Sequence, residues 1–359
     1  MSISSLHDNL NQFLGSCCEE LGFSQWGASS LHNPLSLEFY RQWLEQNYHG
    51  EMEYLKRHLP QKENPKLLDA RLESAFVFAH SYLPHPKPMV DGFENLRTAF
   101  YAQGEDYHFW LKEKLEALAV RLRAQFPDEV FLCLTDSSPI LERDLAYRAG
   151  LGWVGKNTCL IHPKQGSFFL IGEIVTSMKL SVQAEPVHDF CGTCTRCIDI
   201  CPTGALEKPR LLNAQKCISY LTIESRQIPE ASLRAGIGDL FFGCDLCQTV
   251  CPWNQKAFKN AVKVLATSPL ETEARRALDL DSRSRLVAEL REILSLSGKK
   301  LQKKFEKSPL QRAGPFGLRR NAILVATNQG LHELLPEIQF WNQDEKLAPL
   351  VAWSLERLT

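Results

Sequence analysis

The sequence lacks any long hydrophobic run. No stretch approaches the roughly 18 uninterrupted apolar residues that mark a membrane helix, and the richest one, 168–175, is short and contains Gly172 and Glu173. The first ten residues, MSISSLHDNL, also lack the basic region and the apolar core of an export signal. We therefore expect a cytoplasmic protein that does not associate with a membrane.

Net charge is almost absent as well. Forty-one basic residues stand against 42 acidic ones, which gives a net charge of −1 at pH 7. Affinity for a nucleic acid must then come from a local basic patch. Hydrophobic residues make up 44% and charged residues 23% of the chain, which excludes a disordered or collagen-like protein. At about 150 residues per domain, 359 residues suggest two or three domains.

Residues 1–180 are expected to form an α/β domain. Apolar residues at helical spacing predict helices over 6–21, 35–48, 107–126 and 140–148, and apolar runs predict buried strands over 75–82, 129–134 and 168–180. Gly150 follows the fourth helix and can end it in the left-handed conformation. Arg143 and Asp144, within that helix, are expected to form an internal ion pair. Alternating helices and strands are typical of a layered domain.

The rest of the chain is expected to divide in two. Residues 181–262 form a cysteine-rich segment that cannot fill a conventional core, so its fold must be organised by metal. Residues 263–359 are expected to form a short α-helical, HEAT-like domain. Its predicted helices span 274–296, 318–327, 331–339 and 345–358, without the 30–45-residue period of a long solenoid.

Twelve cysteines are unevenly distributed. Cys17, Cys18, Cys133 and Cys159 are scattered, whereas the other eight lie between Cys191 and Cys251. Because thiols in the cytosol stay reduced, clustered cysteines indicate a metal site rather than disulfides.

The eight cysteines form two related motifs. Cys191-x2-Cys194-x2-Cys197-x3-Cys201-Pro202 is the bacterial ferredoxin run, in which the fourth cysteine ligates the other cluster. Cys217-x26-Cys244-x2-Cys247-x3-Cys251-Pro252 ends in the same way. The reciprocal assignment gives Cys191, Cys194, Cys197 and Cys251 to one four-iron four-sulfur cluster, and Cys201, Cys217, Cys244 and Cys247 to the other. Zinc is the alternative, but it usually takes two separated Cys-x2-Cys pairs.

Several strings together resemble the epoxyqueuosine reductase family. They are YAQGEDYH (101–108), LTDSSPILERDLAYRAGLGWVGKNTCLI (134–161), FLIGEI (169–174), CISYLTIE (217–224) and CPWN (251–254). The resemblance covers nearly the whole chain. It implies a cobalamin-binding N-terminal domain related to reductive dehalogenases, a two-cluster ferredoxin-like domain and a HEAT-like helical end. It also implies an oxidoreductase of queuosine biosynthesis that removes the epoxide oxygen of epoxyqueuosine at the wobble position of tRNA.

The resemblance places the family's proton donor at Asp136. Burial over an apolar cofactor face would raise the pKa of this carboxyl and keep it protonated near neutral pH. The alternative is that Asp136 only caps the following helix.

Other cobalamin contacts implied by the resemblance are less securely placed. They are Arg57 (or His58, if the match slips by one residue), Tyr101, Lys156, Asn157, Leu160, Ile171, Ser219 and Cys244. Tyr107 and His108 either line the substrate cavity or pack the helix that they begin. The Gly150–Asn157 turn is not a nucleotide P-loop, because Asn157 replaces the Ser or Thr that binds magnesium.

A basic run lies in the C-terminal part, between Lys299 and Arg320. Such a run is either a solvated face or, for an enzyme that acts on tRNA, a surface that contacts phosphates. The expected tRNA contacts are Arg226, Lys299, Lys300, Lys303, Lys304, Lys307, Arg319 and Arg320.

Two rival functions use the same parts. A reductive dehalogenase would act on a small halogenated molecule, but it leaves the basic run unexplained. A two-cluster electron carrier leaves the first 180 residues without a task. We therefore expect a monomeric epoxyqueuosine reductase that receives electrons from an external low-potential donor.

Overall fold

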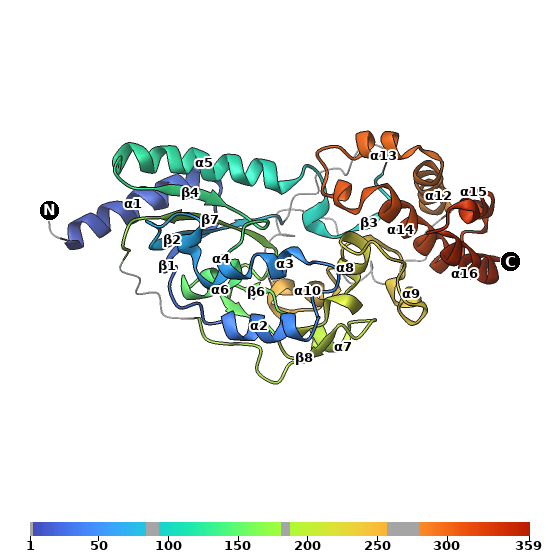
Figure 1. Cartoon of the computed structure of the whole chain (residues 1–359), viewed down its shortest axis with the longest axis horizontal. Coiled ribbons are helices and arrows are strands. Elements are labelled where there is room, and N and C mark those ends of the chain that lie inside the picture. The colour runs from blue at the N-terminus through green and yellow to red at the C-terminus, as the bar shows by residue number, and fades with distance from the viewer. Residues whose placement is uncertain (1–2, 84–92, 181–186, 257–279) are drawn as a thin grey trace.

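The computed structural model describes residues 3–83, 93–180, 187–256 and 280–359. Figure 1 shows an elongated molecule, with a sheet domain at the N-terminal end and a group of helices at the C-terminal end. The expected boundary at 262/263 lies outside the described residues, and the one at 180/181 lies at the edge of a gap in them. No helix in the described ranges is both long and apolar enough to cross a membrane.

The N-terminal domain is built on one antiparallel sheet in the order β1-β2-β7-β4. β2 (Ser74–Ser81), β4 (Phe131–Leu134) and β7 (Phe169–Thr176) confirm the three predicted strands. β1 (Gln25–Ser30) was not predicted, because its sequence QWGASS contains few large apolar residues. All strand pairings in this four-stranded sheet are antiparallel. The sheet is therefore not the parallel type that is built from strand–helix–strand crossovers.

Helices cover both faces of this sheet. Phe76, Phe78 and Ile174 pack on one face with α1 (Ile3–Leu21) and α5 (Tyr107–Gln125). Ala75, Val77 and Val175 pack on the other face with α6 (Glu142–Arg148). Because side chains alternate between the faces and both faces are buried, β2 and β7 read as nearly continuous apolar runs.

The end of α6 lies very close to β1. A side chain at Gly27 would place its Cβ 2.2 Å from the carbonyl oxygen of Ala149, so only glycine permits this approach. Gly150 has a φ of 77° and ends the helix in the left-handed conformation, as predicted. The expected Arg143–Asp144 pair is wrong: Asp144 pairs with Arg148 at 2.6 Å, one helical turn away.

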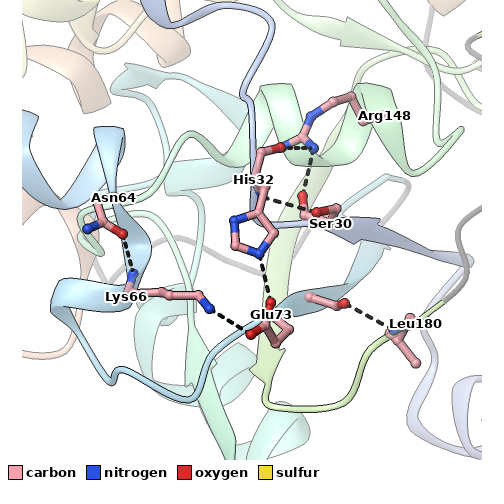
Figure 2. A network of polar contacts seen from close by, with 8 residues as sticks. Ser30, His32, Asn64, Lys66, Glu73, Arg148 and Leu180 are labelled. Atoms are coloured by element: carbon pink, nitrogen blue, oxygen red, sulfur yellow. Dashed lines mark hydrogen bonds and ion pairs between the residues drawn. The ribbon is translucent and has the colours of Figure 1, made fainter.

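Figure 2 shows the polar network at this corner of the sheet. Arg148 donates from Nη1 to the carbonyl oxygen of Ser30 at 2.6 Å. The Glu73 carboxylate receives both His32 Nε2 at 2.7 Å and Lys66 Nζ at 2.6 Å. The network therefore joins α6, the end of β1 and the segment before β2.

Short elements connect the sheet domain to the cysteine-rich segment. Between β1 and β2 lie α2 (Leu37–Glu45), α3 (Tyr54–Arg57) and α4 (Leu59–Glu63). β5 (Trp153–Val154) pairs with β6 (Leu160–Ile161), and β8 (Leu206–Lys208) pairs with β9 (Leu211–Leu212). The cysteine-rich segment also contains α7 (Arg196–Asp199), α8 (Ile218–Ile223), α9 (Ala231–Ile237), β10 (Leu240–Phe242) and α10 (Leu246–Thr249).

The cysteine-rich segment and the C-terminal helices share one hydrophobic core. It joins Leu221 and Phe242 to residues of α12 (Leu280–Ser295), α13 (Gly298–Lys304), α14 (Gly314–Asn328), α15 (Leu335–Phe340) and α16 (Ala348–Leu358). β3 (Arg97–Thr98) pairs in parallel with β10, so a piece of the N-terminal region also enters this core. The four C-terminal helix predictions correspond to α12, α14, α15 and α16, although residues 274–279 of the first lie outside the described residues, and α13 was not predicted.

Arg320 joins α14 to the cysteine-rich segment from inside the core. Its side chain is fully buried and donates from Nη1 to the carbonyl oxygens of Ser225 at 2.6 Å and Gln227 at 2.9 Å. Asn321 accepts from the same guanidinium and donates to the carbonyl oxygens of Thr222 and Phe241. The bonds to Ser225, Thr222 and Phe241 are buried, so these carbonyl groups would be costly to leave unpaired.

We predict that Arg320→Ala lowers the free energy of unfolding by about 3 kcal/mol, because it leaves buried carbonyl groups without a donor. Chemical denaturation followed by circular dichroism measures this change. The control is Lys303→Ala on the exposed side of α13, which should change stability by less than about 0.5 kcal/mol. An equally small change for Arg320→Ala would contradict the structural role.

Candidate active site

One large cavity lies where the three parts of the chain meet. Its volume is about 1770 Å³. Residues of α2, α3 and the 136–158 region line one side, and residues of the cysteine-rich segment such as Ile223 and Phe242 line another. Pro309, Gln311 and Arg312 contribute from the C-terminal helical region. The cavity exceeds the roughly 300–1,000 Å³ of a site for a drug-sized ligand.

Asp136 lies at the edge of this cavity, two residues after β4 ends. The hydroxyl of Thr135, the residue before it, donates to the carbonyl oxygen of Ile171 at 3.0 Å and ties this segment to β7. Asp136 has a φ of 47°, a left-handed conformation that costs about 1–3 kcal/mol outside glycine and is concentrated at functional sites. Its side chain is 56% exposed and lines the cavity. The strained turn therefore presents the carboxylate to the cavity.

His108 connects Asp136 to a second carboxylate. His108 Nε2 lies 2.9 Å from Asp136 Oδ2, and its Nδ1 lies 2.7 Å from Asp106 Oδ1. Asp106 also caps α5, since it accepts from the backbone N–H of His108. Hydrogen bonds to Asp106 and Asp136 raise the pKa of His108 to about 9, although burial opposes them. The imidazole is therefore a cation at neutral pH.

The pKa of Asp136 is lowered in this structure, whereas the expectation was a raised pKa for a carboxyl buried over a cofactor face. Burial does raise the pKa of this carboxyl, but the hydrogen bond and the positive charge of His108 outweigh burial, and the net pKa is lowered. The reason is that a paired cation favours the ionised carboxylate. The proton of the pair is held on His108, which can pass it to Asp136 across their hydrogen bond.

Aromatic side chains form the wall beside this pair. Tyr107 stacks on His108 with ring centroids 4.2 Å apart, and Tyr101 meets Tyr107 edge to face at 5.9 Å. Both tyrosines line the cavity, and burial first, with the charge of Asp136 second, raises the pKa of each. They remain neutral phenols that can donate hydrogen bonds.

Cations surround the cavity. The Lys and Arg residues in its lining are Arg57, Lys62, Arg143, Arg210, Arg226 and Arg312. Arg312 pairs with Glu224 at 3.0 Å and lies over the ring of Tyr54. Both Arg57 and His58 line the cavity, so a slip of one residue in the family match does not change the expected placement.

The cysteine thiols come together as two sets. The pKa of the Cys197 thiol is raised by burial and then by the charges of Cys191, Cys251 and Cys194. The pKa of the Cys244 thiol is raised by burial and then by the charges of Cys217 and Cys201. The Cys247 thiol is influenced by Cys244 and Cys217. No group of metal-binding side chains suited to one ion is found among the described residues. These influences run within the two reciprocal sets, and the assignment of the ligands stays a prediction.

Lys156 and Asn157 lie elsewhere than expected. Lys156 Nζ donates to the carbonyl oxygens of Gly192 at 2.6 Å and Cys194 at 3.0 Å, and Asn157 donates to the carbonyl of Cys247 at 3.2 Å. Neither residue is among those that line the cavity in the described parts of the chain. The turn that carries them faces the cysteine loops, which the two side chains brace.

Some of the remaining expected cofactor contacts line the cavity, and the others lie in the packed core or beside the cysteines. Arg57, Tyr101 and Asp136 line the cavity. Leu160 is buried in the apolar layer under α6, with Ile171 packed against the same layer. Ser219 follows Cys217 at the start of α8, and Cys244 belongs to the second thiol set.

The basic run is only partly available to a ligand. Lys299, Lys300, Lys303 and Lys307 are exposed, whereas Lys304 is engaged with Glu292 at 3.2 Å. The expectation that Arg320 contacts tRNA is wrong, because its guanidinium is buried in the joint described above. Arg319 is also engaged: it donates to the carbonyl oxygen of Leu296 and stacks on the Trp341 ring.

The run nevertheless lies beside the cavity. The backbone N–H of Asp106 donates to the carbonyl oxygen of Lys307 at 2.7 Å, which joins the end of the run to the partner of His108. Arg226, which also lines the cavity, donates to the carbonyl oxygens of Arg312 and Ala313. The exposed lysines and the cavity therefore belong to one continuous region.

Sequence reasoning missed part of the site. Asp106 was not named as a functional residue, although Asp-x-His at the start of a predicted helix was a visible signal. Lys62 carried no local signal, and Arg312 belongs to the basic run but was not expected at the cavity; the tertiary fold brings α4 and the 309–313 segment there.

Two known families match parts of this sequence. Residues 190–254 match the family described as "4Fe-4S double cluster binding domain". Residues 62–137 match "Epoxyqueuosine reductase QueG, DUF1730". The first match covers all eight clustered cysteines, which favours iron–sulfur clusters over zinc, and the second includes Asp106, His108 and Asp136.

Whole-chain relatives carry the same name. The chain is 38% identical over 298 residues to an epoxyqueuosine reductase of Pseudomonas aeruginosa, covering 82% of this chain and 79% of that one. It is 35% identical to the Escherichia coli enzyme over 357 residues, or 94% and 88% of the two chains.

Solved structures are similar over almost the full length. An epoxyqueuosine reductase bound to an epoxyqueuosine-modified tRNA-Tyr stem loop is 26% identical, with a TM-score of 0.79 over 98% of this chain and 90% of that one. A Bacillus subtilis epoxyqueuosine reductase, described with a catalytic aspartate loop swung out of its active site, also has 26% identity and a TM-score of 0.79, over 98% and 91%.

We predict that wild-type protein binds about eight iron and eight sulfide per chain, and that Cys201→Ala keeps only half. The cluster expected to be lost is the one on Cys217, Cys244 and Cys247. Iron analysis and EPR spectroscopy measure both results. Cys133→Ala, outside both sets, is the matched control and should keep all the iron. Loss of the Cys191–Cys197 cluster alone would refute the reciprocal assignment.

Proposed function

The chain belongs to the epoxyqueuosine reductase family, and from this premise we propose how its own residues remove the epoxide oxygen of epoxyqueuosine in tRNA. The observation that carries the proposal is the Asp106–His108–Asp136 chain at a cavity that residues of the cysteine-rich segment also line. The reaction takes up two electrons and two protons. It converts the epoxide into an alkene and releases water.

Cobalamin fits the cavity. The volume of about 1770 Å³ accommodates a ligand much larger than an ordinary metabolite, and the lining combines tyrosines with cations. Arg57, Tyr101 and the apolar side chains Ile223 and Phe242 would contact it. When bound, cobalamin and the two clusters supply electrons at low potential.

Asp136 and His108 supply a proton. At neutral pH the raised pKa of His108 keeps its proton within the hydrogen bond to Asp136. As the carbon–oxygen bond opens, negative charge develops on the oxygen, and Asp136 passes the proton to it. A positioned acid of this kind typically contributes about 10²–10⁴-fold to the rate. Asp106 holds the imidazole in place by its hydrogen bond to Nδ1.

The two thiol sets differ in their access to solvent. Residues around Cys194 are exposed, including Thr193, Thr195 and Arg196, so an external low-potential donor can reach this loop. The second set lies next to α8 and β10, which contribute Ile223 and Phe242 to the cavity wall. Electrons therefore enter near Cys194 and leave on the cavity side.

The exposed lysines of the basic run bind the phosphates of the tRNA. Such contacts orient the RNA without reading its sequence. The modified base enters the cavity beside Lys307 and Arg226, because the run and the cavity are joined there. A tRNA substrate is in keeping with a cytoplasmic enzyme, and the proposal retains a monomer. The rival functions, dehalogenation of a small molecule and simple electron transfer, leave the lysines or the cavity without a role.

We predict that Asp136→Asn reduces turnover by about 100-fold or more, because an amide cannot pass the proton from His108 to the developing oxygen anion. Binding of tRNA and cobalamin should not change. In wild type, the proton is present on His108 below its pKa of about 9 and lost above it. Turnover should therefore fall as the pH rises through about 9.

Anaerobic reconstitution with cobalamin and epoxyqueuosine-modified tRNA, followed by nucleoside analysis, measures both effects. Asp128→Asn is the matched control, since Asp128 is exposed and precedes the same strand, β4, at its other end. Full turnover by Asp136→Asn would return Asp136 to a helix-capping role. If the wild-type protein forms no queuosine, the proposed function itself is refuted.

We predict that replacing Lys300, Lys303 and Lys307 with Gln weakens tRNA binding by roughly tenfold or more and reduces its salt dependence. A phosphate contact that is lost no longer releases its counterions on binding, so both the affinity and its salt dependence decrease. Titration with tRNA at several salt concentrations measures both quantities. A triple control at the exposed Lys112, Lys179 and Lys346 should leave them unchanged. Equal affinities and slopes for the two triple variants would mean that the run is only a solvated face.

A further inference from the structure

A carboxyl group without any partner lies in the centre of the sheet. Glu173 is fully buried, and neither of its carboxyl oxygens has a hydrogen-bond partner. Its neighbours in register are Val77 on β2 and Leu134 on β4. Burying an isolated charge in such surroundings is very costly, so a group of this kind keeps its proton instead.

Glu173 faces a small group of ionisable side chains. The charges of three of them affect the pKa of Glu173. They are Glu142 in the first turn of α6, Asp136, and Lys62 of α4. Lys62 is buried and donates to the carbonyl oxygen of Ile140 at 2.7 Å, without a direct bond to either glutamate. Of the other elements against β7, β2 and β4 present Val77 and Leu134 in register with Glu173, and α5 packs on the opposite face, against Gly172.

Glu142 connects this buried group to the cavity. It lines the cavity, yet its Oε1 is buried without a partner. The backbone N–H of Asp136 interacts with its carboxyl group. Burial first, and the charge of Asp136 second, raise the pKa of Glu142 to about 8, although Lys62 and Arg143 oppose the shift. Burial first, and then the charges of Glu142 and Asp136, raise the pKa of Glu173, although Lys62 opposes the shift.

Protons are therefore held unequally along this line of carboxyl groups. Burial favours the protonated forms of Glu173 and Glu142, whereas the pairing with His108 favours the ionised form of Asp136. The order from the sheet interior to the cavity is Glu173, Glu142, Asp136. Packing alone does not require an acid at residue 173, because glutamine has the same shape as a protonated glutamate.

We propose that Glu173 and Glu142 form a buried proton store that supplies the second proton of the reaction. The inference rests on the proposed function, in which an epoxide, two electrons and two protons give an alkene and water. The external donor provides the electrons. His108 and Asp136 protonate the oxygen when the first carbon–oxygen bond breaks. The store then protonates Asp136, which passes this proton to the departing hydroxyl, so that water leaves as the second bond breaks. Solvent refills the store after product release.

Infrared spectroscopy in H₂O and D₂O tests the stored proton directly on the reconstituted protein. Wild type at neutral pH should show the carbonyl band of a neutral carboxylic acid that shifts in D₂O. Glu173→Gln should lose the Glu173 part of this band. Glu289→Gln is the matched control, because Glu289 is also buried but accepts hydrogen bonds from Asn95. An unchanged band in Glu173→Gln would mean that Glu173 is ionised, which overturns the proposal.

Single-turnover kinetics test the use of the proton. Glu173→Gln should slow queuosine formation roughly tenfold or more and increase the solvent isotope effect, with tRNA affinity and iron content unchanged. Glu289→Gln should match wild type. Wild-type rates in Glu173→Gln would overturn the proposal while leaving the proposed function intact. If Glu173→Gln does not fold, Glu142→Gln provides the same comparison, and wild-type rates there have the same meaning. An inactive wild type would instead refute the proposed function.

Discussion

His108 and Asp136 meet at 2.9 Å beside the cavity, and their pairing controls the charge of the groups around them. The negative charge that His108 stabilises on Asp136 raises the pKa of Tyr101, Tyr107, Glu142 and Glu173. Burial is the larger cause of the raised pKa in all four groups, and the charge of Asp136 adds to it. Proton donors therefore surround the place where an oxygen anion must be neutralised.

The pair depends on a rigid support. Asp136 follows β4, and the hydroxyl of Thr135 ties the turn to β7. The sheet is buried on both faces, so it cannot shift without disturbing the packing of α1, α5 and α6. His108 sits in the first turn of α5 and is held there by Asp106. Two separately packed elements therefore bring the acid and its cation together, and the left-handed turn at Asp136 is maintained by the structure around it.

The cysteine-rich segment is not an independent attachment. Its residues share a core with the C-terminal helices, and buried Arg320 links the two. Three side chains of the sheet domain contact the cysteine loops, those of Trp153, Lys156 and Asn157. Trp153 Nε1 lies 3.4 Å from the Cys191 sulfur. The cavity is thus bordered by parts that cannot move freely relative to one another. This arrangement suits electron transfer, which requires fixed distances, and it places the basic run beside the cavity entrance.

Local patterns in the sequence determined much of this protein. The apolar runs of β2, β4 and β7 and the spacing of α5 and α6 are set by burial, which acts on every second or every third to fourth residue. The cysteine spacing indicated the double-cluster domain and predicts its two thiol sets, since a few residues of chain limit which thiols can meet around one cluster. The order of the strings around Asp136 identified the family.

Only the tertiary structure decided how charges are paired. Arg320 belongs to a basic run in the sequence, but α14 turns it into the core. Asp136 was expected to be a neutral acid, and a histidine 28 residues away in sequence made it a carboxylate. Glu173 was part of an apolar strand whose single acid carried no visible meaning, until Glu142 and Lys62 were found to face it. Ionisation depends on burial and on charges within a few ångströms, and residues far apart along the chain supply both.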